Sequence, residues 1–193
     1  MTDAELLEHV ARRLNQCSVP FMVVGSVASS YHGEPRVSYD IDLVIDATAE
    51  QVEQFVASFG PPFYVSDIAA RQAVRRRGMF NVIHPECRCK VDVILLKDGD
   101  FPRSQFERRM PALVWGVTTA VASAEDTILA KLSWSRRGGS ERQFRDAVGV
   151  AFAQSGKLDA AYLWRWAAHT NIEDLLERAL AEAEEERRQQ DSQ

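Results

Sequence analysis

The chain has 193 residues, enough for one large hydrophobic core with a helical extension but few for two fully independent domains. Hydrophobic residues make up 46% of the sequence and charged residues 26%, a composition that excludes intrinsically disordered and membrane-embedded proteins. The formal net charge of −5 argues against the broadly basic surface that dedicated nucleic-acid-binding proteins usually have.

The N-terminal segment and the cysteines bear on where the protein resides. Residues 1–16 mix charged and apolar positions as an amphipathic helix does, and they differ from a signal peptide. No later apolar run approaches a membrane-spanning length. The three cysteines, Cys17, Cys87 and Cys89, cannot all pair within the chain, so we expect reduced, packed thiols. These features predict a cytoplasmic protein with no membrane partner.

Helices and strands alternate in the first part of the chain. The patterns predict helices over 3–16 and 49–59 and strands over 21–24 and 40–46. Between the two strands, Ser26 is a suitable N-cap and Gly33 a suitable terminator of a short helix. Pro61-Pro62 then breaks the pattern, and a helical stretch that carries several arginines follows.

The second part changes from strands to helices. Strands are expected over 78–84 and 89–97, in a hairpin around His84-Pro85-Glu86, with one more strand within the valine- and threonine-rich residues 112–122. Helices are expected over 123–136, 141–154, 158–169 and 171–188. The change of pattern predicts a catalytic core of residues 1–122 with a helical subdomain of residues 123–193 packed on it.

Three aspartates stand on predicted strands in a pattern that favours a metal site. Asp40 and Asp42 are two apart, so they project from the same face of their strand. Asp92 interrupts an apolar strand, where an ionised carboxylate needs a cation, a hydrogen-bonding partner or an exposed cleft. If the two strands are neighbours, the three carboxylates converge and repel one another. Magnesium, or manganese in its place, suits such oxygen ligands and also binds phosphates.

A glycine and a serine precede these aspartates at a predicted strand-to-helix turn. Backbone N–H groups at such a turn favour an anion, and Gly25 leaves room for close approach. The hydroxyl of Ser26 adds a hydrogen-bonding group, although Ser26 is also suited to be a plain helix cap. Together with the three aspartates, this turn predicts a site for a metal-bound nucleoside triphosphate.

The stretch from Val24 to Leu43 resembles the opening motif of the polymerase-β-like nucleotidyltransferase superfamily. It is most similar to the AbiEii-like branch, the nucleotidyltransferase toxins of type IV toxin–antitoxin systems. In that branch the Gly-Ser turn is followed, in order, by residues that here are Gly33, Arg36, Ser38 and Asp40-Ile41-Asp42. Glu125-Asp126, Lys131 and Asp146 resemble the family's later acidic helix start, lysine and aspartate.

The resemblance implies a fold, an activity and a role for each matching residue. It implies an α/β minimal nucleotidyltransferase core, with a mixed β-sheet flanked by helices and a C-terminal helical bundle, that transfers a nucleotide from a triphosphate such as ATP. Asp40, Asp42 and Asp92 would bind the metal, or Asp92 would serve as base for the acceptor hydroxyl. Lys131 would neutralise triphosphate charge, and Asp146 would orient Lys131 or the nucleotide. The remaining nucleotide-binding residues would be Gly25, Ser26, Arg36 and Ser38.

Several residues have a second interpretation. Lys131 borders an apolar helix face and is also placed to extend to solvent, while Asp146 is spaced to pair with Arg142 along one helix. His84, Cys87 and Cys89 lack the spacing of a standard zinc site. The four tryptophans, expected to pack in the core or between helices and not to stack on bases, are Trp115, Trp134, Trp164 and Trp166.

The sequence does not identify the molecule that accepts the nucleotide. A toxin would modify RNA or protein and have a separate antitoxin partner, whereas an antibiotic-modifying enzyme would use a small hydroxylated acceptor. RNA would need basic side chains, and the sequence offers two arginine clusters, although each taken alone is better interpreted as a solvated face: Arg71 with Arg75, Arg76 and Arg77, and Arg136 with Arg137, Arg142 and Arg145. A different class of function is a catalytically silent member of the fold that binds a nucleotide or a protein.

Overall fold

The computed structural model describes residues 1–87 and 90–192, which form two compact units. Unit 1 comprises Met1–Val24 and Val37–Ala122, and unit 2 comprises Gly25–Arg36 and Ser123–Gln193. The sequence-based division at residues 122 and 123 stays a prediction, and the compact units differ from it by grouping residues 25–36 with the C-terminal helices.

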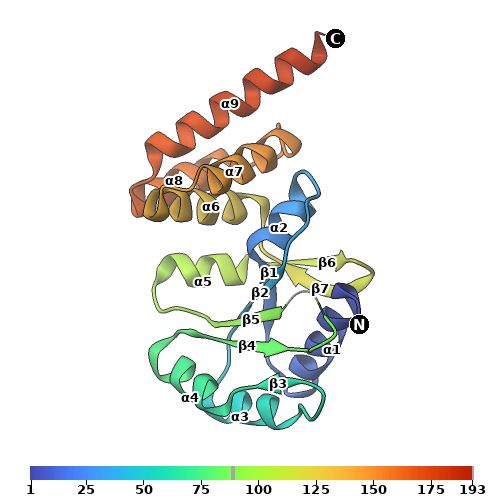
Figure 1. Cartoon of the computed structure of the whole chain (residues 1–193). Coiled ribbons are helices and arrows are strands. Elements are labelled where there is room, and N and C mark those ends of the chain that lie inside the picture. The colour runs from blue at the N-terminus through green and yellow to red at the C-terminus, as the bar shows by residue number, and fades with distance from the viewer. Residues whose placement is uncertain (88–89, 193) are drawn as a thin grey trace. The chain divides into compact units, whose positions relative to one another are not determined.

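Unit 1 contains a mixed β-sheet with seven strands in the described residues (Figure 1). The strands are β1 (Phe21–Val24), β2 (Asp40–Ile45), β3 (Tyr64–Val65), β4 (Met79–Ile83), β5 (Lys90–Leu95), β6 (Met110–Val114) and β7 (Val117–Val121). Their order across the sheet is β3-β4-β5-β2-β1-β7-β6. β1 pairs with β7, and β2 with β5, in parallel, whereas the other pairs are antiparallel. The sheet confirms the predicted mixed α/β core.

The two faces of this sheet differ in what covers them. Four helices belong to unit 1: α1 (Asp3–Gln16), α3 (Ala49–Ala57), α4 (Asp67–Arg76) and α5 (Asp100–Glu107). Phe55 of α3 packs against Phe80 of β4, with ring centroids 6.3 Å apart, and α4 packs beside α3 on β4. Successive strand residues face opposite ways, so Asn81 lies on the other face. On that face, Phe106 of α5 packs in a cluster with Met22, Leu96 and Ala122.

Three features of unit 1 differ from the sequence-based predictions. Residues 112–122 form parts of two strands, because the chain turns back at Trp115 and Gly116, whose φ angles are 50° and 84°. The short strand β3 and the helix α5 were not predicted. The predicted hairpin around residues 84–86 is confirmed by the pairing of β4 with β5, although Cys89, at the start of its predicted second arm, lies outside the described residues.

Unit 2 is helical throughout its described residues and confirms the predicted C-terminal bundle (Figure 1). Its helices are α2 (Gly25–His32), α6 (Ala124–Gly138), α7 (Glu141–Ala153), α8 (Ala160–Thr170) and α9 (Glu173–Asp191). α2 packs on α6 and α7, and α7 also packs on α9. None of the described helices combines the length and the apolar character that crossing a membrane requires.

Gly33 ends α2 as predicted and also permits close packing. Its N–H donates to the Ser29 carbonyl at 2.8 Å. A Cβ atom at this position would lie 3.0 Å from the backbone nitrogen of Val150 in α7, closer than ordinary contacts allow. The α2–α7 contact therefore depends on glycine at residue 33.

Candidate functional site

The register of β2 and β5 brings the predicted aspartates onto one face of the sheet. The two strands are parallel neighbours, with Asp42 directly beside Asp92 and Asp40 directly beside Lys90. Side chains paired in this way project to the same side, as do residues two apart along each strand. We call these four residues, Asp40, Asp42, Lys90 and Asp92, the carboxylate cluster.

Asp92 is the most buried carboxylate of the cluster, with 7% of its surface exposed. Each of its oxygens accepts a hydrogen bond from the Lys90 ammonium at 2.8 Å, and Oδ1 also accepts one from the Asn81 amide. The same ammonium lies 3.5 Å from Oδ1 of Asp40. The hydrogen bond to Asp92 raises the pKa of Lys90 above its ordinary value, although burial opposes the shift. The buried carboxylate is therefore neutralised by a cation of the chain itself.

Lys90 and Asn81 were not predicted as site residues, although the sequence contains an indication for each of them. Lys90 stands two residues before Asp92, so it shares the face of that carboxylate. Asn81 lies on the first arm of the predicted hairpin, and the register of β4 with β5 places it opposite Asp92. Polar residues on the aspartate face of both arms were the available signal.

The donor chemistry of the carboxylate cluster fits a hard divalent cation. Its acidic ligands are carboxylate oxygens, which magnesium and manganese prefer. A positive group already lies against Asp92 and near Asp40, which shows that this place favours a cation. Across the described residues, however, no group of three or more histidine, cysteine or acidic side chains is gathered as a metal site in its present arrangement. The predicted metal-binding role of the three aspartates stays a prediction.

Unit 2 gathers four further predicted site residues. The Asp146 carboxylate accepts hydrogen bonds from Arg36 Nη2 and Lys131 Nζ, each at 2.6 Å. The same Arg36 nitrogen donates to the Ser26 hydroxyl at 2.7 Å, and Lys131 Nζ lies 3.5 Å from that hydroxyl. We call Ser26, Arg36, Lys131 and Asp146 the basic cluster.

The basic cluster decides between the two interpretations of its lysine and its aspartate. The Lys131 side chain is only 4% exposed, so the prediction that it extends to solvent is wrong. Asp146 binds Arg36 and Lys131 across the fold, so the prediction that it pairs with Arg142 is also wrong. Ser26 lies inside α2 with its hydroxyl in the cluster, which replaces its expected role as N-cap.

Electrostatics leave the basic cluster suited to an anion. Burial favours the neutral acid, but the hydrogen bonds from Arg36 and Lys131 outweigh it and lower the pKa of Asp146. Two cations and one carboxylate then give a net charge of one positive unit. The Nε atom of Arg36 is buried and has no hydrogen-bond partner among the described atoms. A buried donor of this kind beside a positive group is available to a phosphate oxygen.

Gly25 and Ser38 are the two remaining predicted nucleotide-binding residues. Gly25 begins α2 with a φ angle of 64°, a conformation that glycine adopts without strain. Ser38 belongs to unit 1, where its hydroxyl donates to the backbone oxygen of Asp40 at 2.9 Å. Its contact is therefore with the backbone that carries Asp40.

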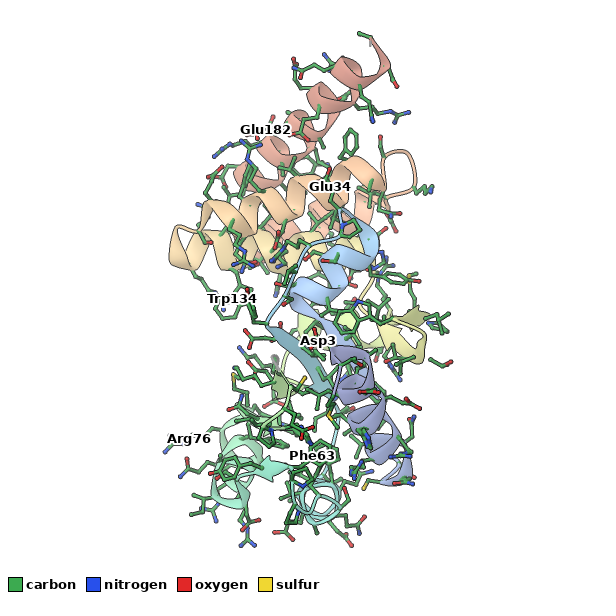
Figure 2. The ribbon with its side chains drawn as sticks, turned by 45° about the vertical axis from the view of Figure 1, so that its right-hand side comes forward. Asp3, Glu34, Phe63, Arg76, Trp134 and Glu182 are labelled. Carbon is green, nitrogen blue, oxygen red and sulfur yellow. The ribbon has the colours of Figure 1, made fainter. Side chains whose placement is uncertain are left out.

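Other residues considered in the sequence lie outside both clusters. His84 accepts a hydrogen bond from the backbone of Glu86 and packs against Phe63. Of the four tryptophans only Trp166 is buried, which agrees with packing in the core, whereas Trp115, Trp134 and Trp164 are exposed and lie outside the core. Figure 2 shows Trp134 projecting from α6.

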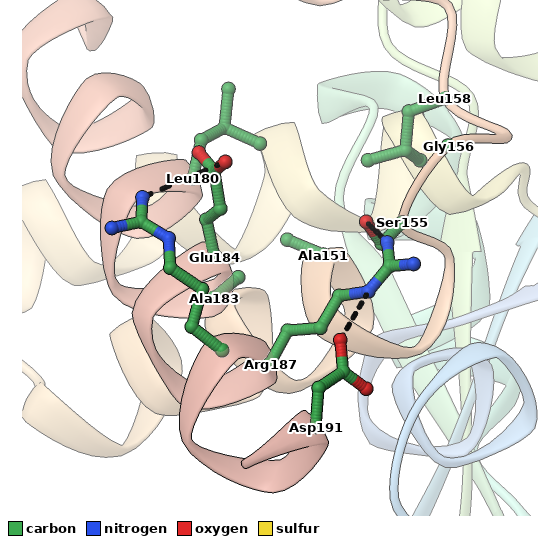
Figure 3. Close-up of a pocket in the computed structure, with 10 residues that line it drawn as sticks. Ala151, Ser155, Gly156, Leu158, Leu180, Ala183, Glu184, Arg187 and Asp191 are labelled. Atoms are coloured by element: carbon green, nitrogen blue, oxygen red, sulfur yellow. Dashed lines mark hydrogen bonds and ion pairs between the residues drawn. The ribbon is translucent and has the colours of Figure 1, made fainter.

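A pocket of about 380 Å³ lies in unit 2, between the C-terminal half of α9 and the segment that follows α7 (Figure 3). Arg187 crosses it to donate to the Ser155 hydroxyl at 2.5 Å. None of the predicted site residues lines this pocket.

Comparison with known proteins bears on the fold that carries the two clusters. No family model and no curated protein matches the sequence of this chain. Among solved structures, the antibiotic-resistance factor ANT(2'')-Ia in complex with adenylyl-2''-tobramycin matches with a TM-score of 0.59 and 13% identity, over 86% of this chain and 95% of that one. This chain has a nucleotidyltransferase fold.

Two further structures share this nucleotidyltransferase fold. An antigenic nucleotidyltransferase-like protein from Paracoccidioides brasiliensis matches with a TM-score of 0.56 and 19% identity, over 92% of this chain and 91% of that one. The lincomycin-bound lincosamide antibiotic adenylyltransferase LnuA matches with a TM-score of 0.50 and 15% identity, over 77% of this chain and 96% of that one. Likeness at such identities concerns the fold, and the assignment to the AbiEii-like branch stays a prediction.

Proposed function

We propose that the chain is a metal-dependent nucleotidyltransferase, which moves a nucleoside monophosphate from a nucleoside triphosphate to an acceptor hydroxyl. The observation that carries this proposal is the register of β2 and β5, which places Asp40, Asp42 and Asp92 on one sheet face. The basic cluster in unit 2 supports it, because buried cations with an unused donor suit a triphosphate.

The carboxylate cluster has two tasks in this proposal. Asp40, Asp42 and Asp92 would hold magnesium, or manganese, which supplies neutralisation of the triphosphate charge. The acceptor oxygen forms a bond to the α-phosphorus as the bond to the leaving pyrophosphate breaks. In the alternative role, Asp92 accepts the proton of the acceptor hydroxyl. Asn81 then fixes the orientation of that carboxylate.

The basic cluster has the task of binding phosphate. Lys131 and Arg36 supply the charge, and the Ser26 hydroxyl supplies a further hydrogen-bonding group. Asp146 positions both cations by accepting from each of them at 2.6 Å. Because Asp146 binds Arg36 through one nitrogen, Nη2, the Nε donor stays available to a phosphate oxygen.

Among the described residues, four of the eight arginines in the two clusters pair with acidic side chains, which favours a small hydroxylated acceptor over RNA. Arg71 belongs to α4, on the sheet face opposite the carboxylate cluster, and pairs with Asp67 at 3.2 Å. In unit 2, Arg136 pairs with Asp174, and Arg145 lies 3.0 Å from a Glu182 oxygen. Phosphates of RNA need accessible, uncommitted basic groups along their path. An RNA or protein acceptor, with an antitoxin partner and a cytoplasmic location, stays a prediction.

The decisive assay follows label from each α-labelled nucleoside triphosphate into small hydroxylated molecules, total RNA and protein, with and without magnesium. The native chain is compared with Asp42→Asn and with the control Asp98→Asn, which changes an exposed acid paired to Arg77. Transfer by the native and control proteins, lost in Asp42→Asn, supports the proposal and identifies the acceptor class. No transfer by any form, with no triphosphate binding by calorimetry, identifies a catalytically silent protein instead.

A further inference from the structure

The carboxylate cluster holds its own cation at the place where a metal would bind. Lys90 Nζ contacts both oxygens of Asp92 at 2.8 Å and lies 3.5 Å from an oxygen of Asp40. A divalent ion that used oxygens of Asp40 and Asp92 would need much of the same space. Two cations at such short separation repel strongly, so the ammonium and the ion cannot share these oxygens.

We propose that Lys90 is an internal counter-ion that competes with the metal, so that metal binding requires the Lys90 ammonium to leave Asp92 and Asp40. The inference rests on the proposed function, because it concerns the metal of that reaction. It assigns to Lys90 a role in setting the metal affinity of the carboxylate cluster.

The burial of the two partners makes this exchange physically reasonable. The Asp92 side chain is 10% exposed, so its carboxylate needs a cation or strong donors whether or not a metal is bound. The Lys90 side chain is 39% exposed on a flexible stem, so its ammonium reaches water after a small rotation. Asn81 keeps its hydrogen bond to Asp92 in either state. The exchange therefore leaves no buried charge without a partner.

The geometry also explains why the acids are not gathered as a metal site. Lys90 neutralises Asp92 and approaches Asp40, so the acidic side chains arrange around an ammonium. If the ammonium occupies the cluster in nine molecules of ten, the apparent metal affinity falls about tenfold below its intrinsic value. Removing the ammonium should therefore raise the apparent metal affinity about tenfold.

Two substitutions at residue 90 separate charge from structure. Lys90→Met keeps an unbranched stem of similar length and removes the charge, whereas Lys90→Arg keeps the charge. A guanidinium binds a carboxylate through two parallel hydrogen bonds, so it should hold Asp92 at least as firmly as the ammonium does. The competition therefore predicts the tightest metal binding in Lys90→Met and the weakest in Lys90→Arg.

The test is a titration with Mn²⁺ followed by electron paramagnetic resonance of the free ion, without nucleotide. We expect Lys90→Met to bind Mn²⁺ about tenfold more tightly than the native chain and Lys90→Arg to bind it several-fold more weakly. Equal or weaker binding by Lys90→Met overturns the inference while the proposed function stands. Absence of binding in native chain and Lys90→Met, also with a triphosphate added, removes the metal dependence and the inference together.

Folding of the variants is followed by circular dichroism in the same samples. Should Lys90→Met fail to fold, Lys90→Arg decides the question. Weaker Mn²⁺ binding by folded Lys90→Arg than by the native chain then supports the competition, and equal or tighter binding overturns it.

Discussion

Asp146→Asn tests whether an ionised, buried pair holds the basic cluster together. Lys131 and Asp146 are almost fully buried, and their charged atoms lie 2.6 Å apart. The substitution leaves the ammonium with a neutral amide oxygen and with the Ser26 hydroxyl at 3.5 Å. Removing one partner of a buried pair costs about 3–5 kcal/mol. Because the amide oxygen still accepts a hydrogen bond, we expect a loss near the lower limit, about 3 kcal/mol.

The loss is measured by urea denaturation, followed by circular dichroism and tryptophan fluorescence. Trp134, Trp164 and Trp166 belong to unit 2 and report on the part of the chain that contains the pair. For a chain of this size the loss corresponds to roughly 6–12 °C in thermal midpoint. Glu184→Gln is the matched control, because it neutralises an exposed acid of α9 that pairs with Arg188, and it should change the free energy of unfolding by less than about 0.5 kcal/mol.

Acidification gives the same pair an independent signature. The pKa of Asp146 is lowered in the folded chain, so its stabilisation is fully present above the unfolded pKa of about 3.9. It is lost as the pH falls through the lower, folded value. The stability difference between the native chain and Asp146→Asn should therefore shrink below about pH 4. A loss under about 1 kcal/mol at neutral pH would refute the idea of a buried, ionised pair.

Three further substitutions follow from other contacts. Arg36→Lys should weaken triphosphate binding about tenfold, as measured by calorimetry, because a lysine ammonium lacks the separate Nε donor of arginine. Unchanged affinity would exclude Arg36 from the phosphate site. Gly33→Ala should lower the free energy of unfolding in urea by about 1–3 kcal/mol, because the new Cβ atom would meet the backbone of Val150. Gly149→Ala, whose Cβ atom would meet nothing within 4 Å, should raise it slightly. Equal effects of the two substitutions would contradict the packing argument. Trp115→Asn should raise the free energy of unfolding by about 1 kcal/mol, because asparagine tolerates a φ angle of 50° better than tryptophan does. A lower urea midpoint than that of the native chain would count against this prediction.

The parts of the fold that the sequence predicts well are those where side-chain periodicity and caps agree. The helix over 3–16 and the strand over 21–24 have the predicted bounds, because the amphipathic spacing of the first, the continuous apolar run of the second and their flanking residues agree. The hairpin of β6 and β7 was missed because its turn is Trp115-Gly116, which lacks the usual Asn-Gly signal. The helix α5 was missed because Gly99 precedes it without a side-chain cap.

Local sequence patterns predict one part of the candidate site, whereas the other part depends on contacts between residues that are far apart in the chain. The spacing of Asp40, Asp42 and Asp92 predicts a shared face because strand geometry has a period of two. The resemblance implies that Asp146 orients Lys131 or the nucleotide, whereas the contact between Arg36 and Asp146 was not predicted. Arg36 and Asp146 are 110 residues apart in the chain, and no local pattern specifies such a contact.

The charges of the carboxylate cluster explain why a lysine is useful at residue 90. Three ionised carboxylates carry three negative units, which the Lys90 ammonium reduces to two. A divalent ion that takes the place of the ammonium reduces them to one. Without Lys90, the buried Asp92 carboxylate would lose its cation and keep only neutral donors such as Asn81. In this proposal Lys90 lowers the cost of burying Asp92 while no metal is bound, at the expense of metal affinity. Metal should accordingly raise the thermal midpoint of Lys90→Met more than that of the native chain, because a ligand stabilises in proportion to how tightly it binds the folded state.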